Sequence, residues 1–134
     1  MALWGCGPVG LFVAHSAKVQ GAKRVIAIDD VPERLERARR AGAEPLDRRE
    51  VNVVRALKDL TDGHGPEKCI DAVGLEAHGP TAALGLIDRV QTALKLETKR
   101  PVALREAIVA CKAAGTVSVP GVYGGLSNAF PGGA

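Results

Sequence analysis

Gly5-Cys6-Gly7-Pro8-Val9-Gly10 follows the apolar stretch 2–4 at the start of the chain. Further on, the apolar run 25–28 ends in Asp29, 19 residues after Gly10. A glycine loop between a strand and a helix, with an acid closing the second strand, is typical of dinucleotide binding. In that pattern Gly5 permits a tight turn, Gly7 lets the backbone approach a pyrophosphate, and Gly10 lets the helix pack on the strand. The helix N-terminus offers N–H groups and a positive dipole to the phosphates.

Asp29 is predicted to hold both hydroxyls of the adenosine ribose. A carboxylate favours a free 2′-hydroxyl and repels a 2′-phosphate, so the pattern favours NAD over NADP. Asp30 adds a second negative charge, and its better interpretation is the N-cap of the next helix. The alternative for Asp29 is a simple cap at the end of a strand.

The composition is that of a globular protein and excludes several classes. A length of 134 residues suits one domain, and 46% hydrophobic with 25% charged residues are ordinary values. The net charge of +3 is too small and too dispersed to indicate nucleic acid. The sequence shows no apolar run long enough for a bilayer and no secretory signal, so we expect no membrane partner and a cytoplasmic protein.

The cysteines and histidines do not form a recognisable centre. Cys6, Cys69 and Cys111 are too far apart for zinc spacing, so they are interpreted as small buried hydrophobic residues. No nucleophile–base pair is visible either, and we expect no catalytic residue in this chain. The residues considered for that role were His15, His64, His78, Glu67, Asp71 and Glu76.

Strand-like and helical segments alternate along the chain. Strands are expected at 2–4, 24–29, 45–46, 68–73 and 116–120, with helices ending at Gly21 and Gly42, a third near 53–60 and a long helical stretch ending at Gly115. This alternation predicts an α/β fold, a Rossmann-type doubly wound parallel sheet of order 3-2-1-4-5. We expect one partial domain, residues 1–134, truncated at both ends because the first strand is short and a sixth is missing.

Four apolar stripes are predicted to face the core. The first helix presents Val9, Phe12, Val13, Ser16 and Ala17; the third presents Val53, Leu57 and Leu60; the last stretch presents Leu84, Ile87, Val90 and Leu94, then Leu104, Ile108 and Cys111. Ligands of such sheets bind beyond the carboxyl ends of the strands, at the switch between the first and fourth. That rule brings together the glycine loop, Asp29, Ala72-Val73-Gly74 and Pro120-Gly121-Val122.

Four stretches, taken together, resemble the medium-chain, zinc-dependent alcohol dehydrogenases. They are residues 4–10, 25–29, 69–74 and 115–125, and they span essentially the whole chain. The insertion between the fourth and fifth strands, with Leu-Glu-Thr-Lys-Arg-Pro at 96–101, is similar to the formaldehyde dehydrogenase-like branch. The resemblance implies the NAD-binding portion of an oxidoreductase that moves hydride between an alcohol or aldehyde and NAD.

The resemblance also implies roles for matching positions. Backbone groups near Pro8 and Val9 would meet the pyrophosphate, and Arg34 would lie beside the ribose with Asp29. Ala72 and Val73 would line the cofactor's path, and main-chain groups of Pro120 and Val122 would bind the carboxamide. The family's catalytic zinc lies in a domain that this chain lacks, so the chain alone is expected to be inactive. The complete protein is expected to be a homo-oligomer acting on a small alcohol or aldehyde.

Two other interpretations remain open from the sequence. The chain could be a standalone, non-catalytic nucleotide-binding module from a truncated reading frame. A Rossmann-type methyltransferase also pairs a glycine loop with an acid after the second strand, although the turn at 120–122 fits a dehydrogenase better.

Overall fold

The structure, a computed structural model, describes residues 1–73 and 102–120 and holds a five-stranded parallel sheet. The sheet order is β3-β2-β1-β4-β5, which confirms the predicted fold and strand order. The strands are β1 (Ala2–Trp4), β2 (Ile26–Asp29), β3 (Glu44–Asp47), β4 (Lys68–Asp71) and β5 (Thr116–Ser118). Parallel strands joined by helices leave every carboxyl end at the same edge of the sheet.

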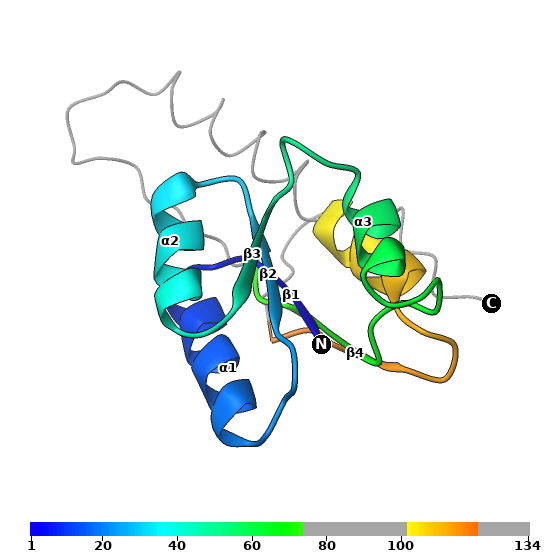
Figure 1. The fold of residues 1–134 in the computed structure, drawn as a ribbon, viewed down its shortest axis with the longest axis horizontal. Coiled ribbons are helices and arrows are strands. Elements are labelled where there is room, and N and C mark those ends of the chain that lie inside the picture. The colour runs from blue at the N-terminus through cyan, green and yellow to red at the C-terminus, as the bar shows by residue number, and fades with distance from the viewer. Residues whose placement is uncertain (74–101, 121–134) are drawn as a thin grey trace.

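Helices cover both faces of the sheet. The first two, α1 (Pro8–Val19) and α2 (Pro32–Arg40), lie on one face, and α3 (Val53–Asp59) lies on the other with the helical residues 102–110 (Figure 1). Each layer encloses its own cluster of buried residues, one around Leu3, Ala14 and Ala27, the other around Trp4, Ile28 and Leu57. None of the described helices has the length and apolar character needed to cross a membrane.

The short strand β1 is the centre of the sheet. It pairs with β2 on one side and with β4 on the other, and Ala2, Leu3 and Trp4 are all buried. Side chains alternate along a strand, so Leu3 faces α1 while Trp4 faces α3. Both hydrophobic layers therefore meet at β1, and the glycine loop leaves directly from it.

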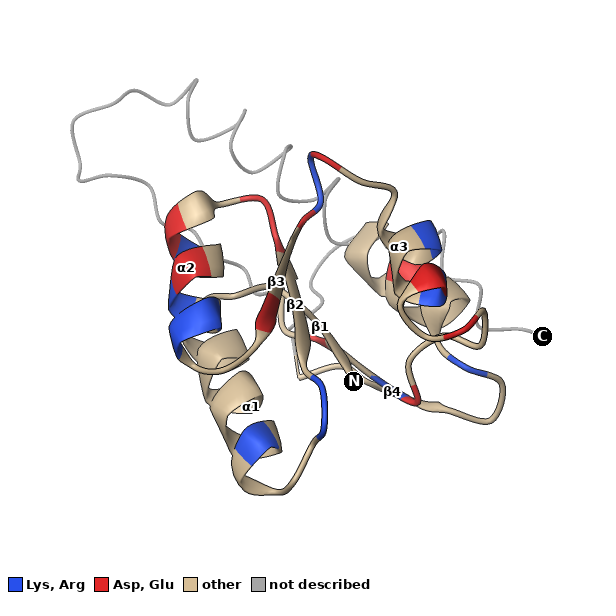
Figure 2. Cartoon of the chain, in the orientation of Figure 1, with Lys and Arg blue, Asp and Glu red and all other residues tan. Residues whose placement is uncertain are grey.

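The helix ends follow the predicted chemistry at several points. Pro8 and Pro32 occupy the first turns of α1 and α2, and Gly21 and Gly42 follow those helices with φ of +87° and +84°. On α2 the first turn carries Glu33 and the last turn carries Arg37, Arg39 and Arg40, so the C-terminal end of the helix is basic, as Figure 2 shows. Glu36 pairs there with Arg39 and Arg40, which lower the pKa of its carboxyl to about 2. The basic residues Arg39 and Arg40 thus lie on a solvated helix face.

The stripe predicted for α1 was wrong for Val9, Phe12 and Ser16, whereas Val13 and Ala17 are partly buried and pack against the core as predicted. The residues that α1 buries are Gly10 and Ala14, whereas Val9 and Phe12 are 54% and 76% exposed and Ser16 is exposed. The cause is the close contact of Gly10 with the sheet, which turns the small residues inward. Phe12 instead borders an open groove beside Ile70.

Two further stripes need correction. Val53 and Leu57 are buried in α3, but the helix ends at Asp59 and leaves Leu60 40% exposed. Helical residues 102–110 pack mainly through alanine, since Ile108 and Cys111 are only half-buried. The buried residues of that segment are Ala103, Leu104, Ala107 and Ala110. The stripe predicted at 84–94 lies outside the described residues.

Gly115 does not cap the last helix. The positive φ of this turn belongs to Ala114, at +62°, and Gly115 leads directly into β5. A Cβ at Gly115 would lie 2.6 Å from Cys111 Sγ, so this glycine serves close packing rather than a left-handed backbone.

Candidate nucleotide-binding site

The glycine loop is fixed by steric contact at both ends. Gly5 has φ of +88°, donates its N–H to Ile28 O at 2.9 Å, and lies where a Cβ would come within 3.0 Å of the Ala72 backbone. At Gly10 a Cβ would lie 1.9 Å from Gly5 O. Because both positions exclude any side chain, helix α1 starts directly against the end of β1.

The first turn of α1 carries free backbone donors. Its N-cap is Gly7, which has no side chain to accept a hydrogen bond, and Pro8 has no N–H. Leu11 is the first residue whose N–H bonds back into the helix, to Gly7 O at 2.9 Å. The N–H groups of Val9 and Gly10 therefore have no acceptor within the helix, and together with the helix dipole they favour an anion.

Asp29 binds the glycine loop to β2. Its carboxylate is 7% exposed, and Oδ2 accepts the N–H of Cys6 at 2.7 Å. Oδ1 accepts the N–H groups of Asp30 and Val31 at 2.7 and 3.0 Å. A carboxylate offers about four acceptor positions, so three backbone donors leave capacity for a further donor. The capping alternative is thus part of the observed geometry, and contact with a ribose stays a prediction.

Asp30 is not the N-cap of α2. That position belongs to Val31, whose own side chain makes no capping hydrogen bond. Asp29 supplies the acceptor instead, one residue earlier, because its Oδ1 reaches two successive amides. Asp29 was predicted to hold a ribose, with a cap at the end of a strand as the alternative, and in the structure it fixes the entry into α2.

Arg34 lies one turn into α2 and acts on the glycine loop through its charge. Burial, followed by the charge of Asp29, raises the pKa of the Cys6 thiol to about 12, and Arg34 opposes that rise. Cys6 is 1% exposed and is held as a neutral thiol. The charge of Arg34 thus acts on the glycine loop at Cys6, while its place beside Asp29 and a ribose stays a prediction.

The carboxyl end of β4 completes the edge beside the loop. Ala72 is buried and donates its N–H to Trp4 O at 2.8 Å, and the Val73 N–H donates to Asp71 Oδ1 at 3.0 Å. Asp71 is fully buried, a feature that the sequence did not predict. Pro120 follows β5 and is exposed. Gly74, Gly121 and Val122 lie outside the described residues.

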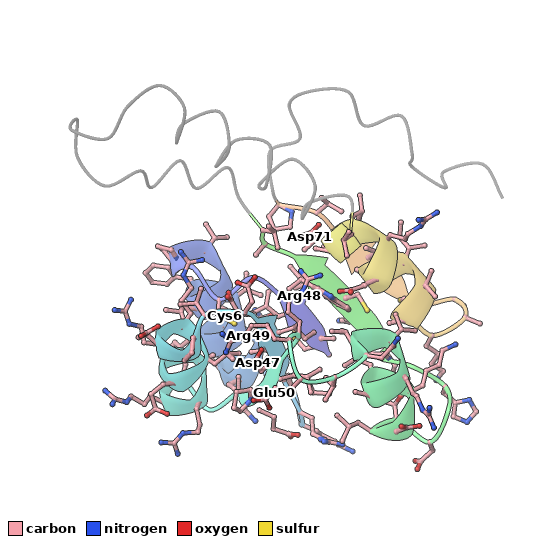
Figure 3. All side chains as sticks on the ribbon, turned by 90° about the horizontal axis from the view of Figure 1, so that it is seen from above. Cys6, Asp47, Arg48, Arg49, Glu50 and Asp71 are labelled. Atoms are coloured by element: carbon pink, nitrogen blue, oxygen red, sulfur yellow. The ribbon has the colours of Figure 1, made fainter. Side chains whose placement is uncertain are left out.

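Sequence reasoning missed a second polar group at this edge. Glu106 accepts a hydrogen bond from Trp4 and one from Arg48, which lie 102 and 58 positions away. In Figure 3 the labelled Arg48 lies between Cys6 and Asp71. No local signal could reveal these contacts, because only the fold brings the three residues together.

No metal centre is formed by the residues in 1–73 and 102–120. No group of three or more His, Cys, Asp or Glu side chains there could hold a metal ion, and His15 and His64 are both exposed. Cys6 and Cys69 are buried, Cys111 is half-buried, and all three are free thiols. The expectation of small buried residues is therefore confirmed for Cys6 and Cys69 and only partly for Cys111.

Comparison with known families shows what kind of protein carries this edge. The family described as zinc-binding dehydrogenase matches residues 8–89, which include α1, Asp29 and β4. The chain belongs to the zinc-binding dehydrogenase family. A zinc-type alcohol dehydrogenase-like protein of Schizosaccharomyces pombe is 36% identical to this chain, over 98% of this chain and 30% of the relative. A protein of the same description from Bacillus subtilis is 39% identical over 95% of this chain and 32% of its own length.

Other relatives extend the comparison. A formaldehyde dismutase of Pseudomonas putida is 38% identical over 90% of this chain and 28% of its own length. The structure of an alcohol dehydrogenase from a Thermus species matches with a TM-score of 0.72 and 33% identity, over 94% of this chain and 29% of that one. An Escherichia coli alcohol dehydrogenase, solved with NADH, shares the fold at a TM-score of 0.64 and 24% identity, over 92% and 29%. This chain therefore spans about a third or less of its relatives' length.

Proposed function

We propose that this chain is the NAD-binding portion of a zinc-type alcohol dehydrogenase, an oxidoreductase that transfers hydride between an alcohol or aldehyde and NAD. The observation that carries the proposal is the coupling of Asp29 to the glycine loop through the Cys6 amide, at 2.7 Å. That single bond sets the acid and the phosphate-binding turn at a fixed separation. Family membership supplies the reaction class.

The residues present fit a dinucleotide. A Cβ would fill the space at Gly5 and Gly10, which brings bare backbone to the edge of the sheet, and the first turn of α1 leaves the amides of Val9 and Gly10 free of intrahelical acceptors. These amides would hold the pyrophosphate, and the remaining acceptor capacity of Asp29 would take the ribose hydroxyls. The effect of the Arg34 charge on Cys6 supports the proposal that Arg34 lies beside that ribose.

NAD supplies the hydride acceptor when it is bound, and the chain's own residues bind and orient it. Ala72 and Val73 follow β4 on the nicotinamide side of the predicted crevice, and Pro120 follows β5. Gly74, Gly121 and Val122 are proposed to complete that side. With the ribose and pyrophosphate held at β1 and β2, the nicotinamide would be directed over β4 and β5.

We propose that zinc binds outside this part of the protein. The residues that the structure describes do not fit a zinc site. Zinc and the substrate are proposed to bind in the part of the protein that corresponds to the remaining length of its relatives. The match to a formaldehyde dismutase supports formaldehyde, or its hydroxymethyl adduct, as a candidate substrate class. A cytoplasmic homo-oligomer is the proposed setting of the complete protein.

Equilibrium binding to the 134-residue chain tests the cofactor. We expect NADH to bind at least about tenfold more tightly than NADPH, because Asp29 repels a 2′-phosphate. In Asp29→Asn the ratio of NADH to NADPH affinity should fall. The exposed control Asp59→Asn, on α3, should leave this ratio unchanged. Equal affinity for both cofactors in the unmodified chain would refute the role of Asp29, and binding of S-adenosylmethionine instead would favour a methyltransferase.

A further inference from the structure

One carboxylate ties together three segments that are distant in sequence. Glu106 lies in the helical residues 102–110, across the sheet from α1. Its Oε2 accepts the indole N–H of Trp4 at 3.0 Å, and its Oε1 accepts a hydrogen bond from Arg48 Nη2 at 3.4 Å. The side chains of Arg48 and Glu106 are 20% and 21% exposed, so water screens their interaction only in part.

These contacts close a ring around the predicted adenosine side of the site. Trp4 is the last residue of β1 and directly precedes Gly5, while Arg48 directly follows β3. The Arg48 backbone N–H donates to Asp29 O at 3.1 Å, and Asp29 Oδ2 accepts the Cys6 N–H. The ring runs from Glu106 through Trp4 to the glycine loop, then through Asp29 and Arg48 back to Glu106.

Trp4 has little freedom to adapt if Glu106 is lost. Its side chain is 1% exposed, and a buried N–H without an acceptor is costly, so the indole would have to move to find one. Trp4 is bonded directly to Gly5, so a movement of Trp4 would displace Gly5 too. Gly5 has a φ of +88° and lies against the Ala72 backbone, so its conformation has little room to adjust. The loop that the nucleotide would meet is thus sensitive to an acceptor on the opposite face of the sheet.

We infer that Glu106 is a positioning residue that holds the glycine loop in its nucleotide-binding conformation through Trp4 and Arg48. For the ligand, NADH, this depends on the proposed function, whereas the ring of contacts exists without it. Glu106 acts through its neighbours and is not assigned a contact with the nucleotide. Through Glu106, the position of helical residues 102–110 would thus affect the conformation of the glycine loop.

Two substitutions in the full 134-residue chain test this role. Glu106→Ala removes the shared acceptor, and the control Glu44→Ala breaks the ion pair with Arg24 that lies at the amino edge of the sheet. Amide-resolved hydrogen exchange reports the Cys6 N–H, and titration reports NADH affinity. We expect Glu106→Ala to speed exchange at Cys6 and to weaken NADH binding, each roughly tenfold. Glu44→Ala should change both less than about twofold.

A conservative variant separates positioning from general stability. The amide oxygen of Glu106→Gln can still accept from Trp4, so it should restore most of the protection at Cys6 and most of the affinity. Trp4 is the only tryptophan, so its fluorescence reports whether the indole keeps its environment in each glutamate variant. Should Glu106→Ala fail to fold, Glu106→Gln and Trp4→Phe carry the comparison. Trp4→Phe removes the indole N–H that bonds Glu106 and also shortens a buried side chain, so it should speed exchange at Cys6, while exchange over the rest of the chain reports the lost packing.

Each outcome decides the matter. Faster exchange confined to the glycine loop, with rescue by Glu106→Gln, supports the positioning role. Exchange that rises equally over the whole chain, or a Glu106→Ala variant that behaves like Glu44→Ala, overturns it. If the unmodified chain binds no NADH, the proposed function fails, and the exchange at Cys6 still decides the role of Glu106 by itself.

Discussion

The two edges of the sheet hold their polar groups in different ways. At the carboxyl edge, Asp29 and Asp71 are 7% and 0% exposed, and both accept backbone N–H groups. At the amino edge, Arg24 and Glu44 form an ion pair whose side chains are 45% and 49% exposed. Exposed pairs contribute little to stability, whereas buried acceptors specify one backbone geometry. The backbone geometry is therefore fixed by buried hydrogen bonds at the carboxyl edge, where a nucleotide would bind, and not at the amino edge.

Gly10→Ala should give the largest loss of stability, because it places a side chain inside the packed contact between α1 and the glycine loop. The new Cβ would lie 1.9 Å from Gly5 O, and backbone atoms cannot move away cheaply. We expect a loss of about 3 kcal/mol in the free energy of unfolding, measured by urea denaturation. Helix propensity alone predicts the opposite sign, a gain of about 1 kcal/mol.

Gly21→Ala is the matched control for that substitution. Gly21 follows the same helix with φ of +87°, but a Cβ at this position would have no atom within 4 Å. The substitution should cost about 1 kcal/mol from backbone strain alone. A Gly10→Ala variant no worse than this control would mean that the close packing of α1 on the loop is not required.

Asp29→Asn should be the next largest effect and tests the buried acceptor itself. Both carboxylate oxygens accept backbone N–H groups, from Cys6 on one side and from Asp30 and Val31 on the other. An asparagine presents one NH₂ group, so one side must face donor against donor. We expect a loss of about 1–3 kcal/mol by denaturation, and an unchanged stability would show that these bonds are not formed in solution.

The sequence predicted the fold and the place of the glycine loop and Asp29 at this edge because those signals are local. The glycine loop, Asp29 and the alternation of strands and helices follow from backbone sterics and hydrogen-bonding rules within short windows. The role of Glu106 could not be predicted, since its partner Trp4 lies 102 positions away. The wrong predictions for Ser16, Leu60 and Asp30 also show the limit of periodicity and capping rules near helix ends.

Raising the pH should lower the folding stability of the chain through the buried thiol of Cys6. Burial, followed by the charge of Asp29, raises the pKa of Cys6 from 9.0 to about 12. Above pH 9 the unfolded chain loses this proton while the folded chain keeps it, so stability falls as the pH rises from 9 towards 12. The slope should reach about 1.4 kcal/mol per pH unit for this group.

Comparison with Cys6→Ala isolates the contribution of that thiol. The difference in unfolding free energy between the two chains should be constant from about pH 7 to 8 and should narrow between about pH 9 and 11. Other titrating groups affect both chains and cancel in the difference. Parallel pH profiles would contradict the buried, neutral state of Cys6.

Phe12→Ser should give the smallest effect and separates the observed burial from the predicted apolar stripe. Phe12 is 76% exposed on α1, and phenylalanine and serine have similar helix propensities, so the substitution reports burial almost alone. We expect a change within about 0.5 kcal/mol, against about 2–5 kcal/mol for Leu57→Ala, whose side chain is fully buried. A loss as large as that of Leu57→Ala would place Phe12 in a core after all. It would also mean that the outer side of α1 is covered in solution, and that the groove beside Ile70 is filled.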